Sequence, residues 1–150
     1  MTPVIAKNNS AALFETIEAP GIRCVFKITG NDSENKIGIY EITMQPNTHG
    51  ASLHYHLIIS ETFIVTSGTL TVQIQDKAIQ LSNGDIAHVP VNTAHGFYND
   101  SDESVTFLLI FTPAMQREGF FRELYTMIAN NTIDADALSA LNNRYDTYPV

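Results

Sequence analysis

Three histidines and one glutamate occur in two short stretches of this chain, and their spacing limits its fold more than any other feature. The first stretch contains His54, His56 and Glu61, and the second contains His95. Successive side chains of a strand point to opposite faces, so we expect His54 and His56 on one face of a strand. Their Cα atoms would lie roughly 7 Å apart, close enough for both imidazoles to reach one ion. We expect Glu61 and His95 to complete the ligand set.

Three imidazoles and one carboxylate form a donor set of intermediate softness. Such a set suits Fe(II), Mn(II), Ni(II), Cu(II) or Zn(II), and ligand type alone does not select among these divalent transition metals. Four protein ligands on an ion that accepts five or six leave positions open for water and substrate. The pattern therefore predicts a metal site capable of catalysis.

Short apolar stretches rich in Val, Ile, Phe, Thr and Tyr fill most of the chain, and turn residues separate them. Many short strands with regular turns indicate a sandwich or a barrel. The predicted strands cover residues 21–28, 36–44, 52–58, 61–65, 70–75, 78–81, 86–89, 95–99 and 104–111.

The pattern becomes helical after residue 111. Thr112 followed by Pro113 predicts an N-cap with proline at the first helical position, and the helix would run to Ala129. Asp134 predicts the cap of a second, shorter helix. The residues expected to face the core are Phe120, Leu124, Met127 and Ile128, with Phe121 and Tyr125 beside them, and Leu138 and Leu141 in the second helix.

The two histidine stretches closely resemble the paired motifs of the cupin superfamily. The first family motif contains His-x-His-x(3,4)-Glu-x6-Gly, and the second is Gly-x5-Pro-x-Gly-x2-His-x3-Asn. The matching residues are His54, His56, Glu61 and Gly68 in the first motif, and Gly84, Pro90, His95 and Asn99 in the second. The resemblance implies an all-β, cupin-type jelly-roll barrel with the metal inside, near one mouth, and short C-terminal α-helices outside it.

Two positions depart from the family pattern without removing a ligand. Only three residues separate Gly50 from His54, where the family has five, so we expect an altered entry turn. Asn92 replaces a glycine, and Asn tolerates the left-handed backbone better than most residues do.

The length of 150 residues and an apolar fraction of 44% predict one globular domain over residues 1–150. Within it we expect an N-terminal arm (1–20), a β-barrel (21–111) and a C-terminal helical extension (112–150). Cupins that resemble this chain often pair as dimers through N-terminal strands. The stretch 11–28 is therefore expected to form a homodimer.

Charge and composition exclude several classes of partner. The net charge is −8 and the eight basic residues are scattered, which argues against nucleic-acid binding. Cys24 is the only cysteine, so an intrachain disulfide is impossible, and we expect it in the core. The longest apolar run, 105–111, is too short to cross a membrane, and no signal peptide is evident. The chain is expected to be soluble and cytoplasmic.

Alternation places further residues around the predicted metal site. Phe63, Val65 and Phe97 share the ligand face and are expected to line an apolar pocket, and Asn99 could orient a ligand or substrate there. Three other residues carry weaker expectations. We expect His49 to be a solvated turn residue and His88 a packed histidine, whereas Tyr40 could point either into the pocket or out of it.

With its C-terminal helices, the chain also looks like a group of bacterial cupins similar to quercetinase-type dioxygenases, a looser resemblance than that of the motifs. We therefore expect a metal-dependent oxidoreductase acting on a small aromatic or enolisable substrate, with Glu61 as general base. The alternatives are an isomerase or lyase that uses Lewis-acid catalysis and a cupin that only binds a small ligand. Little positive charge lies near the motifs, which argues against a phosphosugar substrate.

Overall fold

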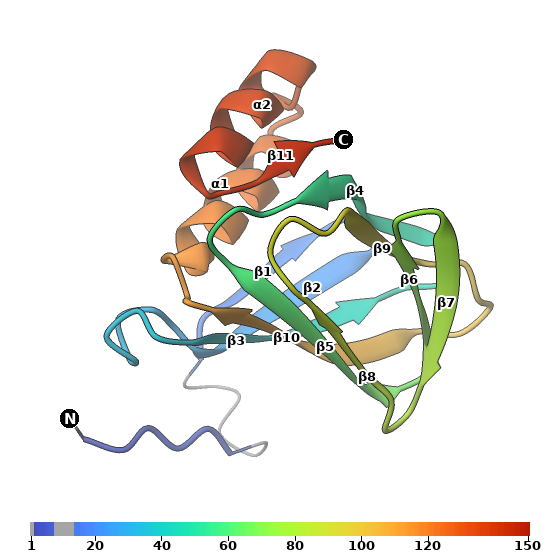
Figure 1. The fold of residues 1–150 in the computed structure, drawn as a ribbon, viewed down its shortest axis with the longest axis horizontal. Coiled ribbons are helices and arrows are strands. Elements are labelled where there is room, and N and C mark those ends of the chain that lie inside the picture. The colour runs from blue at the N-terminus through green and yellow to red at the C-terminus, as the bar shows by residue number, and fades with distance from the viewer. Residues whose placement is uncertain (1, 8–13) are drawn as a thin grey trace.

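Two antiparallel sheets face each other and enclose the core of the protein (Figure 1). The computed structural model describes residues 2–7 and 14–150. One sheet has the strand order β1-β2-β3-β10-β5-β8, and the other has the order β11-β4-β9-β6-β7. The strands are β1 (Thr16–Ala19), β2 (Ile22–Ile28), β3 (Gly38–Met44), β4 (Thr48–Tyr55), β5 (Ser60–Ser67), β6 (Thr69–Ile74), β7 (Lys77–Ser82), β8 (Ile86–Val89), β9 (His95–Asn99), β10 (Val105–Thr112) and β11 (Tyr148–Pro149). The predicted jelly-roll β-barrel is confirmed.

Alternation of side chains explains why the strands lie where the sequence predicts them. Along β3, β5 and β10, buried residues alternate with half-buried ones, as a strand with one face on the core requires. All nine predicted strands are present with small shifts at their ends. The largest shift is in β4, which starts at Thr48 and ends at Tyr55, so His56 lies just beyond the strand.

Gly50 lies inside β4 rather than in an entry turn. The register of β4 against β9 shifts on both sides of Ala51, and the backbone there approaches Phe97 very closely. A Cβ atom on Gly50 would overlap the Phe97 ring. A residue without a side chain is therefore required where this strand crosses the interior aromatic ring.

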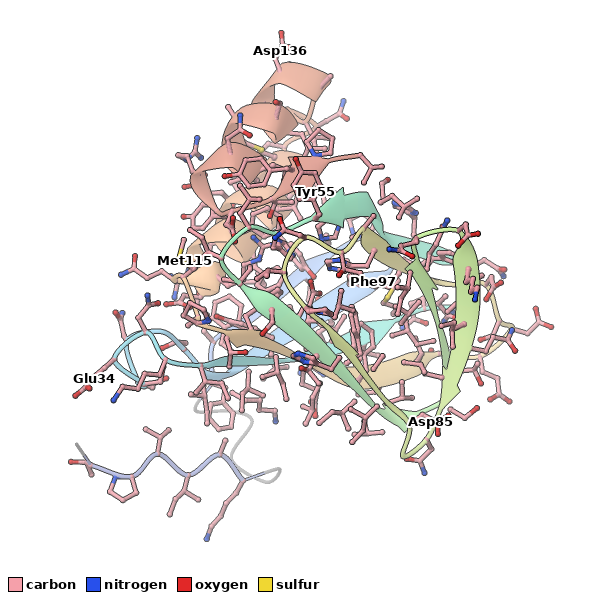
Figure 2. All side chains as sticks on the ribbon, viewed as in Figure 1. Glu34, Tyr55, Asp85, Phe97, Met115 and Asp136 are labelled. Atoms are coloured by element: carbon pink, nitrogen blue, oxygen red, sulfur yellow. The ribbon has the colours of Figure 1, made fainter. Side chains whose placement is uncertain are left out.

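Aromatic rings fill the space between the sheets. Phe63, Phe97 and Phe107 contact one another with ring centroids 5.5–6.1 Å apart, and Figure 2 shows Phe97 in the interior. Tyr40 and Phe121 form a second group, with their centroids 5.0 Å apart, nearer the helices. Offset and edge-on contacts at these distances are the favourable arrangements for aromatic pairs.

Two helices, α1 (Arg117–Ala129) and α2 (Ala135–Arg144), cover one end of the barrel (Figure 1). The predicted start at Thr112 is wrong, because Thr112 is the last residue of β10 and Pro113 follows it in a cis peptide bond. The strand pairing with β5 extends to Thr112, so the helix begins only at Arg117. The predicted cap of α2 is confirmed, since the Asp134 carboxylate accepts a hydrogen bond from the Ala137 N–H (2.8 Å).

The buried face of α1 differs from the predicted stripe. Phe120, Phe121 and Tyr125 are buried, whereas Leu124, Met127 and Ile128 are only half-buried. In α2, Leu141 is fully buried and Leu138 is half-buried. No helix among residues 2–7 and 14–150 has the length and apolarity needed to cross a bilayer.

Two strands extend the sheets beyond the predicted barrel limits of residues 21–111. β1 pairs with β2, so the end of the predicted N-terminal arm belongs to a sheet. β11 pairs with β4, so the C-terminal extension returns to the barrel after its two helices. Both strands are short and lie at sheet edges, where the apolar alternation that reveals longer strands is weak.

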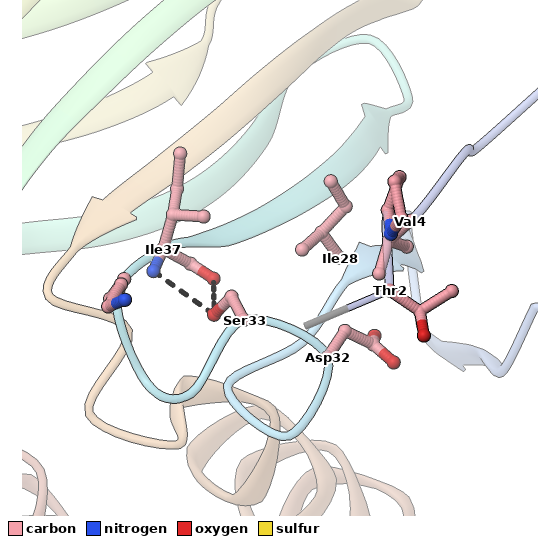
Figure 3. Close-up of a pocket in the computed structure, with 8 residues that line it drawn as sticks. Thr2, Val4, Ile28, Asp32, Ser33 and Ile37 are labelled. Atoms are coloured by element: carbon pink, nitrogen blue, oxygen red, sulfur yellow. Dashed lines mark hydrogen bonds between the residues drawn. The ribbon is translucent and has the colours of Figure 1, made fainter.

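The segment 2–7 lies against the loop that follows β2. A surface pocket of about 340 Å³ opens between them, lined by residues that include Val4, Ile28 and Asp32 (Figure 3). The loop is stabilised by Ser33, whose hydroxyl donates to the Ile37 carbonyl (2.7 Å). Part of the stretch expected to form a dimer, residues 11–13, lies outside the described residues, and the homodimer stays a prediction.

Removal of an interior ring should show how far the barrel depends on its aromatic core. Phe107 is fully buried between Phe63 and Phe97. We expect Phe107→Ala to lower the free energy of unfolding by about 3–5 kcal/mol, measured by urea denaturation. The matched control is Ile86→Ala, which also truncates an apolar strand residue but one that is 63% exposed. Equal losses in the two variants would contradict this picture of the core.

Candidate metal centre

The four residues singled out by their spacing converge at one point inside the barrel. One nitrogen or oxygen atom from each of His54, His56, Glu61 and His95 lies within 4.8 Å of the other three. All four side chains are buried, with His54 the most exposed at 8%. Four such donors within reach of one point form a cluster that could hold a metal ion, so the predicted grouping is confirmed in the fold.

Each sheet contributes to this cluster. His54 in β4 lies directly opposite His95 in β9, in register across two paired strands of one sheet. Glu61 lies near the start of β5 in the facing sheet, and His56 lies in the connection between β4 and β5. The connection is short, so the chain crosses to the other sheet immediately after His56. This crossing brings Glu61 over the histidines.

All three imidazoles are oriented by backbone carbonyl groups. Their Nδ1 atoms lie 2.7, 2.5 and 2.8 Å from the carbonyl oxygens of Ser52, Asp146 and Thr93, in the order His54, His56, His95. A carbonyl oxygen can only accept, so each Nδ1 carries the proton and donates it. The neutral imidazoles therefore present the lone pair of Nε2 as the available metal-binding atom.

The Nε2 atoms of two histidines face the same carboxylate oxygen. Glu61 Oε2 lies 3.1 Å from His56 Nε2 and 2.8 Å from His95 Nε2. With Nδ1 already protonated, a neutral ring would direct a lone pair at a carboxylate, which is repulsive. The arrangement is favourable only when positive charge lies between these atoms, carried either by protons on Nε2 or by a bound cation. The donor set and its charge therefore fit a divalent metal ion.

The pKa values of the cluster reflect its burial and its charges. Burial alone would raise the pKa of Glu61, but the positive charge of His95 and hydrogen bonds from both neighbouring imidazoles lower it well below the usual range. Burial lowers the pKa of His54 to about 4. Burial also acts to lower the pKa of His95, yet its contacts with Glu61 raise it overall. Glu61 is thus a carboxylate at neutral pH, and His54 is neutral.

Arg117, at the start of α1, brings a positive charge close to the cluster. Its side chain is buried, and its guanidinium lies 3.8 Å from the centre of the Phe120 ring. Burial lowers the pKa of Arg117 to about 10, and the negative charge of Glu61 partly offsets that effect. The expectation of little positive charge near the motifs is therefore wrong. The charge comes from a helix some 20 residues beyond the second motif, where spacing carried no signal.

The residues expected to line the pocket divide into two groups. Phe63 and Val65 on β5 and Phe97 on β9 are buried in the barrel interior, and the two rings pack on each other (5.5 Å). Asn99 is also buried, but its amide donates to the carbonyls of Gln45 and Glu103 (2.9 and 2.8 Å). The Asn99 side chain is therefore committed to the loops that follow β3 and β9 and does not orient a group at the cluster, contrary to expectation.

Three weaker expectations also have outcomes. His49 is exposed as predicted, but it belongs to β4 rather than to a turn. His88 is exposed, with Nδ1 2.8 Å from the Thr62 hydroxyl, so the predicted packed histidine is wrong. Tyr40 points into the core, where its hydroxyl donates to Glu118 (2.7 Å). Burial and this hydrogen bond raise its pKa.

Two further expectations hold. Asn92 adopts a left-handed backbone with φ of 60°, as its place in the motif requires, and its N–H donates to the His56 carbonyl (2.7 Å). Cys24 is fully buried in the core, and burial raises the pKa of its thiol well above the ordinary value. The lone thiol is thus a packing residue.

Residues 40–111 match the family profile described as "Cupin domain". The matched segment runs from β3 to β10 and includes all four clustered residues. The segment 40–111 therefore corresponds to a cupin domain, as the motifs indicated.

Comparison with known proteins supports this assignment. Quercetin 2,3-dioxygenase of Bacillus subtilis (strain 168) is 38% identical over 71 residues, which are 47% of this chain and 20% of that protein. The chain thus spans about a fifth of the length of this curated relative. The structure of KdgF from Halomonas sp. is similar with a TM-score of 0.63 and 19% identity, covering 75% of this chain and 94% of that one.

A third similar protein is a sugar phosphate isomerase of the cupin superfamily from Silicibacter pomeroyi. Its structure matches with a TM-score of 0.56 and 23% identity, covering 74% of this chain and 67% of the other. At these identities the two structural matches show a shared fold.

The burial of neutral His54 predicts a loss of stability in acid. Its folded pKa of about 4 lies below the ordinary value of 6.5, so it stabilises the chelator-treated protein above pH 6.5 and that stability is lost as pH falls toward 4. The expected loss is about 3 kcal/mol. Urea denaturation at pH 7 and pH 4 should show a smaller loss in His54→Gln than in the wild type. His49→Gln, at an exposed histidine, is the control and should behave as the wild type does; equal losses in all three proteins would contradict the prediction.

Proposed function

We propose that this cupin domain is a metal-dependent enzyme, similar to a dioxygenase, that acts on a small aromatic or enolisable substrate. The observation that carries the proposal is the cluster of His54, His56, Glu61 and His95, whose donor atoms lie within 4.8 Å of one another. The donor set is compatible with iron, manganese, nickel, copper or zinc and does not select one of them.

The cluster is built in a way that supports metal binding over a purely structural role. A buried ion pair between histidines and a carboxylate costs desolvation energy that apolar residues in the same place would avoid. Each histidine also has its Nδ1 held by a backbone carbonyl, which directs Nε2 at the common point. Orientation of this kind is typical of metal-ligating histidines.

When bound, the ion would supply a Lewis-acidic centre with open positions for a substrate oxygen and for O2. Glu61 is ionised at neutral pH because the neighbouring imidazoles lower its pKa, and it lies where it could accept a proton from the substrate. Phe63 and Phe97 pack on each other deeper in the barrel and make the interior beyond these residues apolar, which favours an aromatic substrate body over a charged one.

The loops next to the ligands also support an apolar substrate. Leu57 and Ile58, which follow His56, are 50% and 55% exposed, and Val91 is 38% exposed. The hydrogen bond from the Asn92 N–H to the His56 carbonyl joins the two loops that carry these side chains. A substrate that approached along these loops would therefore meet apolar groups close to His56.

One observation favours a second candidate, a non-redox isomerase or lyase that works by Lewis-acid polarisation. The buried guanidinium of Arg117 acts electrostatically on Glu61 and His95. A fixed positive charge near the ligands can stabilise an enolate or another anionic intermediate without an electron acceptor. A cupin that only binds a small ligand is the third candidate, and both alternatives predict turnover or binding that does not depend on O2.

Metal analysis tests the centre itself. We expect tag-free wild-type protein to contain close to one transition-metal ion per chain by mass spectrometry, and His56→Ala and Glu61→Ala to lose it. His88→Ala is the matched control, because it removes an exposed histidine outside the cluster and should retain the metal. If the wild type contains no metal even after reconstitution, the proposed centre is wrong.

Oxygen dependence tests the type of reaction. We expect the metal-loaded protein to consume O2 with at least one member of a panel of flavonols and catechols, and to stop when O2 is removed. At equal metal content, Glu61→Gln should turn over more slowly by about 10²-fold or more, because it removes the proton acceptor. Substrate loss that continues unchanged without O2 would exclude the dioxygenase and favour the Lewis-acid reaction.

A further inference from the structure

The chain returns to the metal centre after its second helix. We call residues 145–149 the C-terminal strap. The carbonyl oxygen of Asp146 accepts the hydrogen bond from His56 Nδ1 at 2.5 Å, and β11 pairs with the strand of another ligand, with Pro149 opposite His54. The strap thus reaches two of the four ligands, although it lies outside the segment 40–111 that matches the cupin domain.

The side chain of Asp146 holds the connection between two ligands. Its buried carboxylate accepts hydrogen bonds from three consecutive backbone N–H groups, those of Leu57 (3.0 Å), Ile58 (2.8 Å) and Ile59 (2.9 Å). These residues join His56 to the strand that carries Glu61. Hydrogen bonds to a charged acceptor are stronger than those between neutral groups, so one carboxylate fixes the whole connection.

The strap is itself anchored to the first helix. Arg117 Nη1 donates to the Tyr145 carbonyl (2.8 Å) and to the Thr147 hydroxyl (2.9 Å), on either side of Asp146. Asp146 has a left-handed backbone with φ of 54°, a conformation that Asp tolerates better than most residues. The Tyr145 ring packs against Phe120, with centroids 5.8 Å apart. The helical extension therefore holds the strap in the position from which it contacts His56.

We propose that Asp146 is a positioning residue of the metal centre, which sets the orientation of His56 through its carbonyl and the path from His56 to Glu61 through its carboxylate. The inference rests on the proposed metal centre but not on the proposed reaction. It predicts that metal affinity depends on a residue 90 positions away from the ligand it holds.

The test uses Co(II) as the probe, with affinity measured by competition against a chelator and geometry by the visible absorption spectrum. We expect Asp146→Asn, in which an amide replaces the charged acceptor, to weaken Co(II) binding by about tenfold or more and to change the spectrum. The matched control is Asp134→Ala. It removes the cap of α2 and destabilises the same extension, but it leaves the strap and the ligands untouched, so its Co(II) affinity and spectrum should equal those of the wild type.

Each outcome decides between the two claims. Wild-type affinity and spectrum in Asp146→Asn would overturn the positioning role alone, whereas no Co(II) binding by the wild type would overturn the metal centre and the role with it. Equal weakening in Asp134→Ala would assign the effect to general stability and also overturn the role. If Asp146→Asn does not fold, Thr147→Val decides, since it removes one anchor to Arg117. Weaker binding supports the proposal, and unchanged binding overturns it.

Discussion

The burial of one carboxylate between two apolar sheets is the constraint on which the rest of this structure depends. Glu61 is 2% exposed and remains charged, so its surroundings must supply positive charge or hydrogen-bond donors. His56 and His95 provide the donors, and Arg117 adds a buried positive charge nearby. A divalent cation at the common point would satisfy the same requirement more fully, since it can replace the protons that two imidazoles must otherwise carry.

Antiparallel geometry provides this arrangement with few residues. The pairing of His54 with His95 sets two ligands side by side without any loop, because residues opposite each other in register are neighbours on one face. The short connection after His56 then carries the chain into the facing sheet. Since that connection has no strand partner of its own, its N–H groups need other acceptors, and Asp146 supplies them.

Local patterns explain how much of this could be predicted from the sequence. The period-two alternation of the strands and the motif spacing identified nine strands, the ligand cluster and the left-handed Asn92. The predicted helix start at Thr112 was wrong because strand pairing includes Thr112, although threonine is a good N-cap residue. His88 was misjudged since alternation identifies faces but does not say which face of a sheet is covered. The prediction for Asn99 was wrong for a related reason, because a residue can share a strand face with the clustered residues without lying near them.

Long-range contacts account for what no local pattern could reveal. The strap of residues 145–149 forms a strand too short to show alternation, and Arg117 reaches the cluster only through the docking of α1. Because the chain is synthesised from its N-terminus, these contacts form later than those within the barrel can. All four ligand residues leave the ribosome before the strap does, so the nascent barrel can gather its ligands while His56 still lacks the carbonyl of Asp146. The candidate metal centre can therefore reach its final geometry only after the strap has docked on the barrel.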